Sequence, residues 1–131
     1  MLLSEMHFSE EASDKLGRMK GRTRLTPNIL ARIGFCLSLE NRTPPDFADY
    51  GGMGHISIKW HVLTGAYDAL FVALIKERCY QDGVCEEEIA NQFKAHMNRG
   101  VLLLDKRLKN LDGLLLTLPT AWRQETEVEA G

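Results

Sequence analysis

The dipeptide Thr26-Pro27 constrains the fold of this chain more than any other local feature, because it is typical of the start of a helix. Proline lacks a backbone N–H, but the first position of a helix has no partner for that group, so nothing is lost there. Apolar residues at helical spacing follow and predict a helix over residues 27–40. We expect one apolar stripe of this helix to be buried in the core: Ile29, Leu30, Ile33, Cys36 and Leu37.

A second helix is expected just before this one, over residues 10–23. Ser9 suits the N-cap, and two glutamates follow in the first turn, where the partial positive charge of a helix N-terminus favours acids. Residues 3–8 alternate weakly and predict a short strand. The order strand, helix, turn, helix predicts a ribbon-helix-helix-like unit over residues 1–42, a unit that dimerises by pairing its strand with that of a second copy.

The rest of the chain is expected to be helical apart from one strand. Residues 41–54 are rich in Pro, Gly and Asp and predict a loop, and strict alternation predicts a half-buried strand over residues 55–62. Three helices should follow, with a break at Gly100: residues 65–82, 86–99 and 101–118.

Length and composition favour one mainly α, soluble domain. A chain of 131 residues with 44% hydrophobic and 26% charged residues can bury a core without a disulfide or metal. Three irregularly spaced cysteines favour a reducing cytoplasm over a secreted disulfide framework, and no apolar run is long enough to span a membrane. We expect a single domain over residues 1–119, with its helical half over residues 55–119, and a flexible tail over residues 120–131.

Positive charge is concentrated in residues 15–39, a stretch without Asp or Glu. Its six cations give +6, and because the whole chain has a net charge of −2, the remaining residues carry −8. A block of one sign on an acidic chain indicates an anionic partner, and phosphates fit because each contact releases a counterion. The candidate DNA-binding residues are Lys15, Arg18, Lys20, Arg22, Arg24 and Arg32. The alternative is a solvated helix face on which the first two pair with acids one turn earlier.

Gly17 and Gly21 lie four residues apart on one side of the same predicted helix. Each costs the helix about 1 kcal/mol relative to alanine, and bare backbone allows another backbone to approach closely. The sequence leaves open whether that second backbone belongs to DNA or to a neighbouring helix. A second basic group could extend a DNA-binding surface or be a solvated face: Lys94, Arg99, Lys106, Arg107 and Lys109.

No catalytic motif, metal site or cofactor site is predicted. The three cysteines form no CxxC pair and have no histidine at zinc spacing. Cys36 and Cys79 are expected in the core, and Cys85 precedes three glutamates, a setting that disfavours a reactive thiolate. His55 and His61 are expected on the surface.

Two blocks of the sequence resemble the DndE family: LGRMKGRTRLTPNILARIGFCLSLE at residues 16–40 and LTGAYDALFVALIKER at residues 63–78. With the leucine-rich C-terminal helix, the resemblance extends to about residue 118. It implies a small subunit of the bacterial DNA phosphorothioation system, which replaces a non-bridging phosphate oxygen with sulfur. It also implies a homotetramer that binds double-stranded DNA, with a preference for nicked duplex. Catalysis in that system is assigned to other subunits, so the resemblance implies that this chain is no enzyme.

The residues leave other functions open. A ribbon-helix-helix transcriptional regulator would read an operator sequence, although Glu5 and His7 on the predicted strand suit base reading poorly. A sulfur carrier would use one of the cysteines, and an assembly subunit would use the basic patch to bind an acidic protein instead of DNA. The surplus of leucines after Gly100 predicts that the C-terminal half drives self-association.

Overall fold

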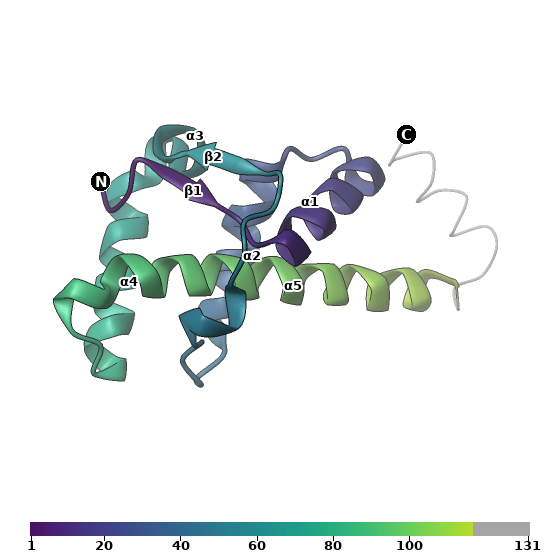
Figure 1. Ribbon diagram of the computed structural model, residues 1–131. Coiled ribbons are helices and arrows are strands. Elements are labelled where there is room, and N and C mark those ends of the chain that lie inside the picture. Colours follow the sequence, from purple (N-terminus) through teal and green to yellow (C-terminus); the bar gives the residue numbers. More distant parts are fainter. Residues whose placement is uncertain (117–131) are drawn as a thin grey trace.

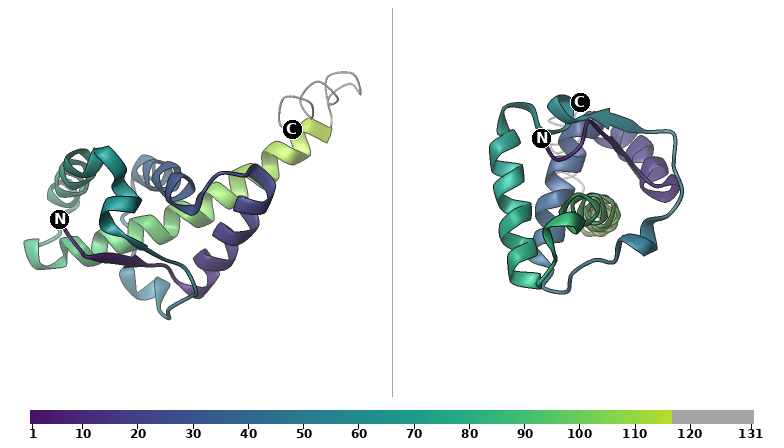
Figure 2. Two further views of the ribbon diagram at one scale, coloured as in Figure 1. Left: turned by 90° about the horizontal axis from the view of Figure 1, so that it is seen from above. Right: turned by 60° about the vertical axis from the view of Figure 1, so that its left-hand side comes forward.

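The computed structural model describes the backbone of residues 1–116 and the side chains of residues 1–111. Helix α5 (Ile89–Leu116) forms the axis of the molecule, and the other elements pack around its N-terminal two thirds (Figure 1). Seen nearly end-on, α5 lies in the middle of the remaining helices and strands (Figure 2). The mainly helical, single-domain fold with a small sheet that the sequence predicted is confirmed, whereas the predicted tail over residues 120–131 lies outside the described residues.

The first two helices have the bounds that the sequence predicted. Strand β1 (Glu5–His7) leads into α1 (Glu10–Thr23), where the Ser9 hydroxyl caps the helix by accepting a hydrogen bond from the Ala12 N–H. Helix α2 (Pro27–Glu40) begins at Pro27, although the Thr26 side chain makes no capping hydrogen bond. These boundaries depend on local chemistry, which is why the sequence contains them.

The sheet is built within one chain. Strand β2 (Ser57–Lys59) runs antiparallel to β1 and pairs Met6 with Ile58. One edge of β1, the strand that a ribbon-helix-helix unit would pair with a second copy, is therefore occupied by β2. A short 3-10 helix, η1 (Phe47–Tyr50), lies in the loop between α2 and β2.

The predicted strand over residues 55–62 was too long, because helix α3 (Trp60–Thr64) begins in its second half. The Trp60 N–H donates to the Ser4 carbonyl, and its buried ring lies 5.3 Å from the Phe93 ring between centroids. The turn into α3 thus follows from the packing of one aromatic side chain, which alternation in the sequence does not reveal.

Two further predictions about helices need correction. The helix expected over residues 65–82 divides into η2 (Gly65–Tyr67) and α4 (Asp68–Asp82). After a short turn, η3 (Glu86–Glu88), the chain continues as α5 without a break at Gly100. Gly100 is instead the place where α5 touches α2: a Cβ added there would collide with the carbonyl group of Gly34.

The buried face of α2 also differs from the predicted one. Leu30 is buried as expected and Leu37 is half-buried, but Ile29, Ile33 and Cys36 are exposed. Helix α2 is apolar on two sides, so periodicity alone cannot choose between them. The side with the smallest residues faces α5, because two helices can cross closely only where their side chains are small. On this side the Phe35 ring packs against the rings of Phe71 and Phe93. The buried residues of α2 are Leu30, Ala31, Gly34, Phe35 and Ser38.

Two arginines hold the C-terminal end of α2 in place. Arg78 of α4 donates to the carbonyl oxygens of Leu39 and Asn41, and Arg99 of α5 donates to those of Ser38 and Thr43. Both guanidinium groups thereby satisfy carbonyls that a helix end leaves without partners. No helix in the described part of the chain is long and apolar enough to cross a membrane.

Candidate nucleic-acid interface

The basic residues of α1 lie from the middle of the helix to its C-terminal end. We call five of them the α1 patch: Lys15, Arg18, Lys20, Arg22 and Arg24. Lys15 is half-buried and the other four are exposed. Cations in the last turn of a helix are stabilised by its partial negative charge, so the helix itself favours this placement. In Figure 1, α1 starts beside α5, and its C-terminal end stands above the second half of that helix.

A buried carboxylate from α5 joins the two helices at the patch. Asp105 is only 3% exposed, and its Oδ2 atom lies 3.6 Å from Lys15 Nζ, 3.6 Å from Arg18 Nη2 and 3.2 Å from Lys109 Nζ. The alternative drawn from the sequence, in which Lys15 and Arg18 pair with acids one turn earlier on their own helix, named a different partner. Three cations around one carboxylate leave a surplus of positive charge, and they extend the patch from α1 onto α5.

Lys109 was not among the six candidate residues, but the sequence holds a signal for it. Asp105 and Lys109 are four residues apart, a spacing at which opposite charges on a helix pair. The neighbouring Lys106 and Arg107 are exposed. The second basic group of the sequence is therefore split: these three cations lie on the second half of α5, whereas Arg99 is used inside the fold.

Arg32, the sixth candidate, lies on a different part of the surface. Its Nε atom donates to the Leu63 carbonyl at 2.7 Å, and its Nη2 atom donates to the Val62 carbonyl at 3.1 Å. These bonds satisfy carbonyls in α3 and hold that helix against α2. The structure therefore does not bring Arg32 together with the α1 patch.

Arg24 ends α1 in a left-handed conformation, with φ of 63°, and its N–H donates to the Lys20 carbonyl. Glycine is the usual residue at such a helix end, because a side chain with a Cβ costs roughly 1–2 kcal/mol in this region. Arginine at this position adds one cation to the exposed end of the patch at that cost to stability.

Gly17 and Gly21 lie in the middle of the exposed face of α1. A Cβ added to either would have nothing within 4 Å, so no neighbouring helix of the described chain explains them. At about 100° per residue, Arg18 and Arg22 follow them on one side of the helix, and Lys20 lies on the other side. A strip of bare backbone thus runs between basic side chains.

The surface at the start of α1 is acidic. Glu10, Glu11 and Asp14 line a hollow of about 390 Å³ at the start of the helix, together with Asp49 and Tyr50. Burial, and to a smaller extent the two neighbouring acids Asp49 and Glu11, raises the pKa of the Tyr50 hydroxyl. This hollow repels phosphate, so the part of α1 that can meet an anion is its C-terminal half.

The small sheet offers little to a nucleic-acid base. On its exposed side, the Ser57 hydroxyl donates to Glu5 Oε1 at 2.7 Å, and His7 Nε2 lies 3.8 Å from Glu5 Oε2. Lys59 stands opposite Glu5 in the register. Ser57 and His7 are therefore already engaged with Glu5 on this side.

The three cysteines of the chain are free thiols. Cys79 is buried, which raises the pKa of its thiol, while Cys36 and Cys85 are exposed. His55 and His61 are exposed, as predicted. Among the side chains that the structure describes, no three of the metal-ligating types converge on one point.

The chain matches a family model described as DNA sulphur modification protein DndE over residues 5–111. It is similar to the crystal structure of DndE from Escherichia coli B7A, which is involved in DNA phosphorothioation modification. The two share 25% identity with a TM-score of 0.64, over 79% of this chain and 99% of that one. A DndE variant with two glycine-to-lysine substitutions shares the fold, at 24% identity and a TM-score of 0.63, over the same shares of both chains. No curated protein matches the chain.

The family match covers both the α1 patch and the side chain of Asp105 that supports it. It also spans the β1–β2 pair and α5 as far as Leu111. The resemblance seen in the two sequence blocks is therefore confirmed over most of the chain, and the chain belongs to the DndE family of DNA phosphorothioation proteins.

Proposed function

We propose that this chain is the non-catalytic, DNA-binding subunit of a DNA phosphorothioation system in the cytoplasm. It grips the backbone of double-stranded DNA, including nicked duplex, through the α1 patch and Lys109. It needs no cofactor, and the chemical steps fall to the other subunits of the system.

One observation carries this proposal: cations from two helices surround a single buried carboxylate, Asp105, and leave a surface of positive sign. The contacts with Asp105 hold Lys15, Arg18 and Lys109 in fixed positions, and a fixed set of charges suits the regular spacing of phosphates. The exposed strip of Gly17 and Gly21 would let a phosphate backbone approach α1 closely.

The test is a titration of intact, nicked and single-stranded DNA at several salt concentrations. Each phosphate contact contributes about −0.9 to the slope of log K against log[salt]. Replacing Lys20 and Arg22 together with alanine should weaken binding to every duplex sequence alike. It should also flatten the slope by about two units, because two counterions are no longer released.

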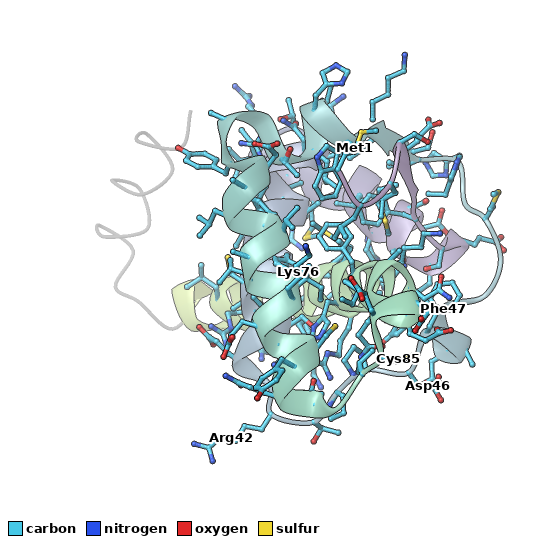
Figure 3. All side chains as sticks on the ribbon, turned by 90° about the vertical axis from the view of Figure 1, so that its left-hand side faces the viewer. Met1, Arg42, Asp46, Phe47, Lys76 and Cys85 are labelled. Carbon is cyan, nitrogen blue, oxygen red and sulfur yellow. The ribbon has the colours of Figure 1, made fainter. Side chains whose placement is uncertain are left out.

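A matched control removes the same charges elsewhere. Arg42 and Lys76 are exposed, and both are labelled in Figure 3, which looks at the end of the molecule away from the C-terminus of α1. Replacing these two with alanine should leave affinity and slope almost unchanged. An equal loss of DNA affinity in both double variants would mean that net charge alone binds DNA. Unchanged affinity in both would mean that the α1 patch does not contact DNA.

Two other outcomes would point to the alternatives. A loss confined to one DNA sequence would favour a ribbon-helix-helix regulator. Absent DNA binding together with capture of an acidic subunit would favour an assembly role. A variant lacking all three cysteines that folds but cannot support DNA modification in cells would return a sulfur-carrier role to consideration.

Self-association belongs to the same proposal. The family resemblance implies a homotetramer, and the exposed apolar side chains of α2, α3 and α4 support association between copies. Leu104 is buried and Leu102, Leu103 and Leu108 are half-buried, so much of the leucine surplus assigned to self-association is absorbed by the fold. Leu114, Leu115, Leu116 and Leu118 lie outside the described side chains. Light scattering at micromolar concentration tests the proposal, and a monomer would contradict it.

A further inference from the structure

The exposed face of α2 is apolar from its start as far as Cys36. Leu25, just before the helix, is 38% exposed, Ile29 is 37% exposed and Ile33 is 42% exposed, and Cys36 is exposed as well. Steps of four, four and three residues place these side chains in one row along the helix. We call this row the α2 stripe.

The α2 stripe carries no charge between its ends. The sequence between Arg24 and Glu40 contains a single charged residue, Arg32, and its guanidinium group donates to the carbonyls of Leu63 and Val62. Single exposed apolar residues are ordinary on a protein surface, but a continuous uncharged row marks an interaction site. The stripe offers no cation to a phosphate, so DNA does not fit it.

The other side of α2 is already used. Leu30 and Phe35 are buried in the core, and Gly34 lies against α5. A helix that is apolar on both sides is typical of a buried helix, yet the described part of the chain covers only one side of this one. The stripe therefore needs a second surface of the same apolar kind.

We propose that a second copy of this chain supplies that surface, with the two α2 helices packed antiparallel about a two-fold axis at Ile33. The uncharged stretch between Arg24 and Glu40, apart from Arg32, has its midpoint at residue 32, next to Ile33. Ile33 would meet Ile33 of the second copy, and Ile29 would lie beside Cys36. This inference rests on the self-association proposed above and assigns it a surface.

Charge at the ends of the stripe favours this orientation. Arg24 precedes the stripe and Glu40 follows it, and both are exposed. An antiparallel pair brings each arginine to the glutamate of the other copy, whereas a parallel pair would bring like charges together. A two-fold pair of this kind uses the same patch on both copies, so this contact alone forms a dimer and a tetramer needs a second interface.

The neighbouring surface widens the contact. Asn28 and Arg32 both donate to the Val62 carbonyl, so α3 lies directly beside α2, and the Val62 side chain is 45% exposed. Stable interfaces bury on the order of 1,200 Å² or more, which exceeds what one helix stripe supplies. The pair would hold two α1 patches at its two ends, about 20 Å apart along helices of 14 residues.

Disulfide cross-linking tests the position of the axis. In a chain carrying Cys36→Ser and Cys85→Ser, the variant Ile33→Cys places one exposed thiol on the proposed axis. Diamide should convert the two thiols to one disulfide, taking up two electrons and two protons, since Cβ atoms about 4 Å apart can be bridged. The matched control, Glu77→Cys in the same background, puts the thiol on the exposed face of α4 and should stay monomeric on a non-reducing gel.

A charged substitution tests the interface without a cross-link. Ile33→Glu should weaken self-association at least tenfold in light scattering, while circular dichroism shows an unchanged fold, since the side chain is exposed. Slow cross-linking at position 33 together with unchanged association of Ile33→Glu would overturn the α2 assignment but leave self-association intact. A monomeric wild-type chain would overturn both self-association and its assignment to the α2 stripe. DNA titration would still test the α1 patch independently.

Discussion

Gly34 and Gly100 meet backbone to backbone where α2 crosses α5. A Cβ added to Gly34 would lie 2.7 Å from both the carbonyl carbon and the carbonyl oxygen of Gly100, too close for any real contact. The two helices therefore approach more closely than side chains would allow. This crossing fixes how α2 packs on the central helix α5.

Replacing Gly34 with alanine should destabilise the protein by about 2 kcal/mol, although alanine is the better helix former. The atoms in the way belong to the backbone of α5, so relief requires that the two helices move apart. Urea unfolding followed by circular dichroism measures the change. A variant as stable as the wild type would mean that α5 can shift at little cost.

The same substitution should act in the opposite direction on α1. Gly17→Ala and Gly21→Ala meet open space, so each should stabilise the protein by up to about 1 kcal/mol through helix propensity. If DNA lies against this strip, the added methyl groups should weaken DNA binding while stability rises. A pair of titrations and unfolding curves separates the two effects, and stabilisation with unchanged affinity would remove the glycine strip from the DNA contact.

Local signals explain what the sequence predicted well. Ser9 and Pro27 set the starts of α1 and α2, because an N-cap and a proline at the first helical position act over a few residues. The block of positive charge predicted the basic part of α1. Contacts between distant residues explain the failures: Gly100 interrupts a pattern in sequence but meets Gly34 in space, and Trp60 turns the chain into α3.

The candidate site shows the same division. The cations were visible as a run of one sign, but their common partner, Asp105, lies far along the chain, and no local pattern links it to Lys15. Arg32 has the charge of a site residue, yet two carbonyls at the end of a neighbouring helix take its donors. The run of positive charge thus predicted a basic surface on α1, while packing decides which of these cations lie together on it.

A buried histidine should make stability depend on pH. His96 is fully buried, and its pKa falls to about 4 because of burial and the nearby Arg99 and Arg78, an effect that Asp82 only partly opposes. Arg99 donates to the Ser38 hydroxyl at 2.8 Å, which directs the hydroxyl proton to His96 Nδ1, also at 2.8 Å. The neutral ring with its proton on Nε2 is thus the form that the fold accommodates.

In the unfolded chain the pKa of this histidine is about 6.5, so the unfolded state binds the proton first as the pH falls. The contribution of neutral His96 is complete above pH 6.5 and is lost between pH 6.5 and about 4, to a total of about 3 kcal/mol. Unfolding free energies from urea titrations at pH 7.5, 6, 5 and 4.5 should follow this curve. The exposed His61→Gln variant should behave like the wild type, and a His96→Gln variant that loses just as much stability would contradict the assignment.

Arg24 offers a test of whether the patch is maintained for binding at the expense of stability. Its left-handed conformation, with φ of 63°, suits glycine, so Arg24→Gly should stabilise the protein by about 1 kcal/mol. The same change removes one cation from the α1 patch, and the salt slope of DNA binding should flatten by about 0.9. Arg24→Lys separates strain from charge, because it keeps both the side chain in the left-handed region and the positive charge, and should resemble the wild type in both measurements. If Arg24→Gly were more stable and bound DNA with an unchanged slope, the arginine would lie outside the DNA contact, and the proposed pairing with Glu40 of a second copy would become its remaining role.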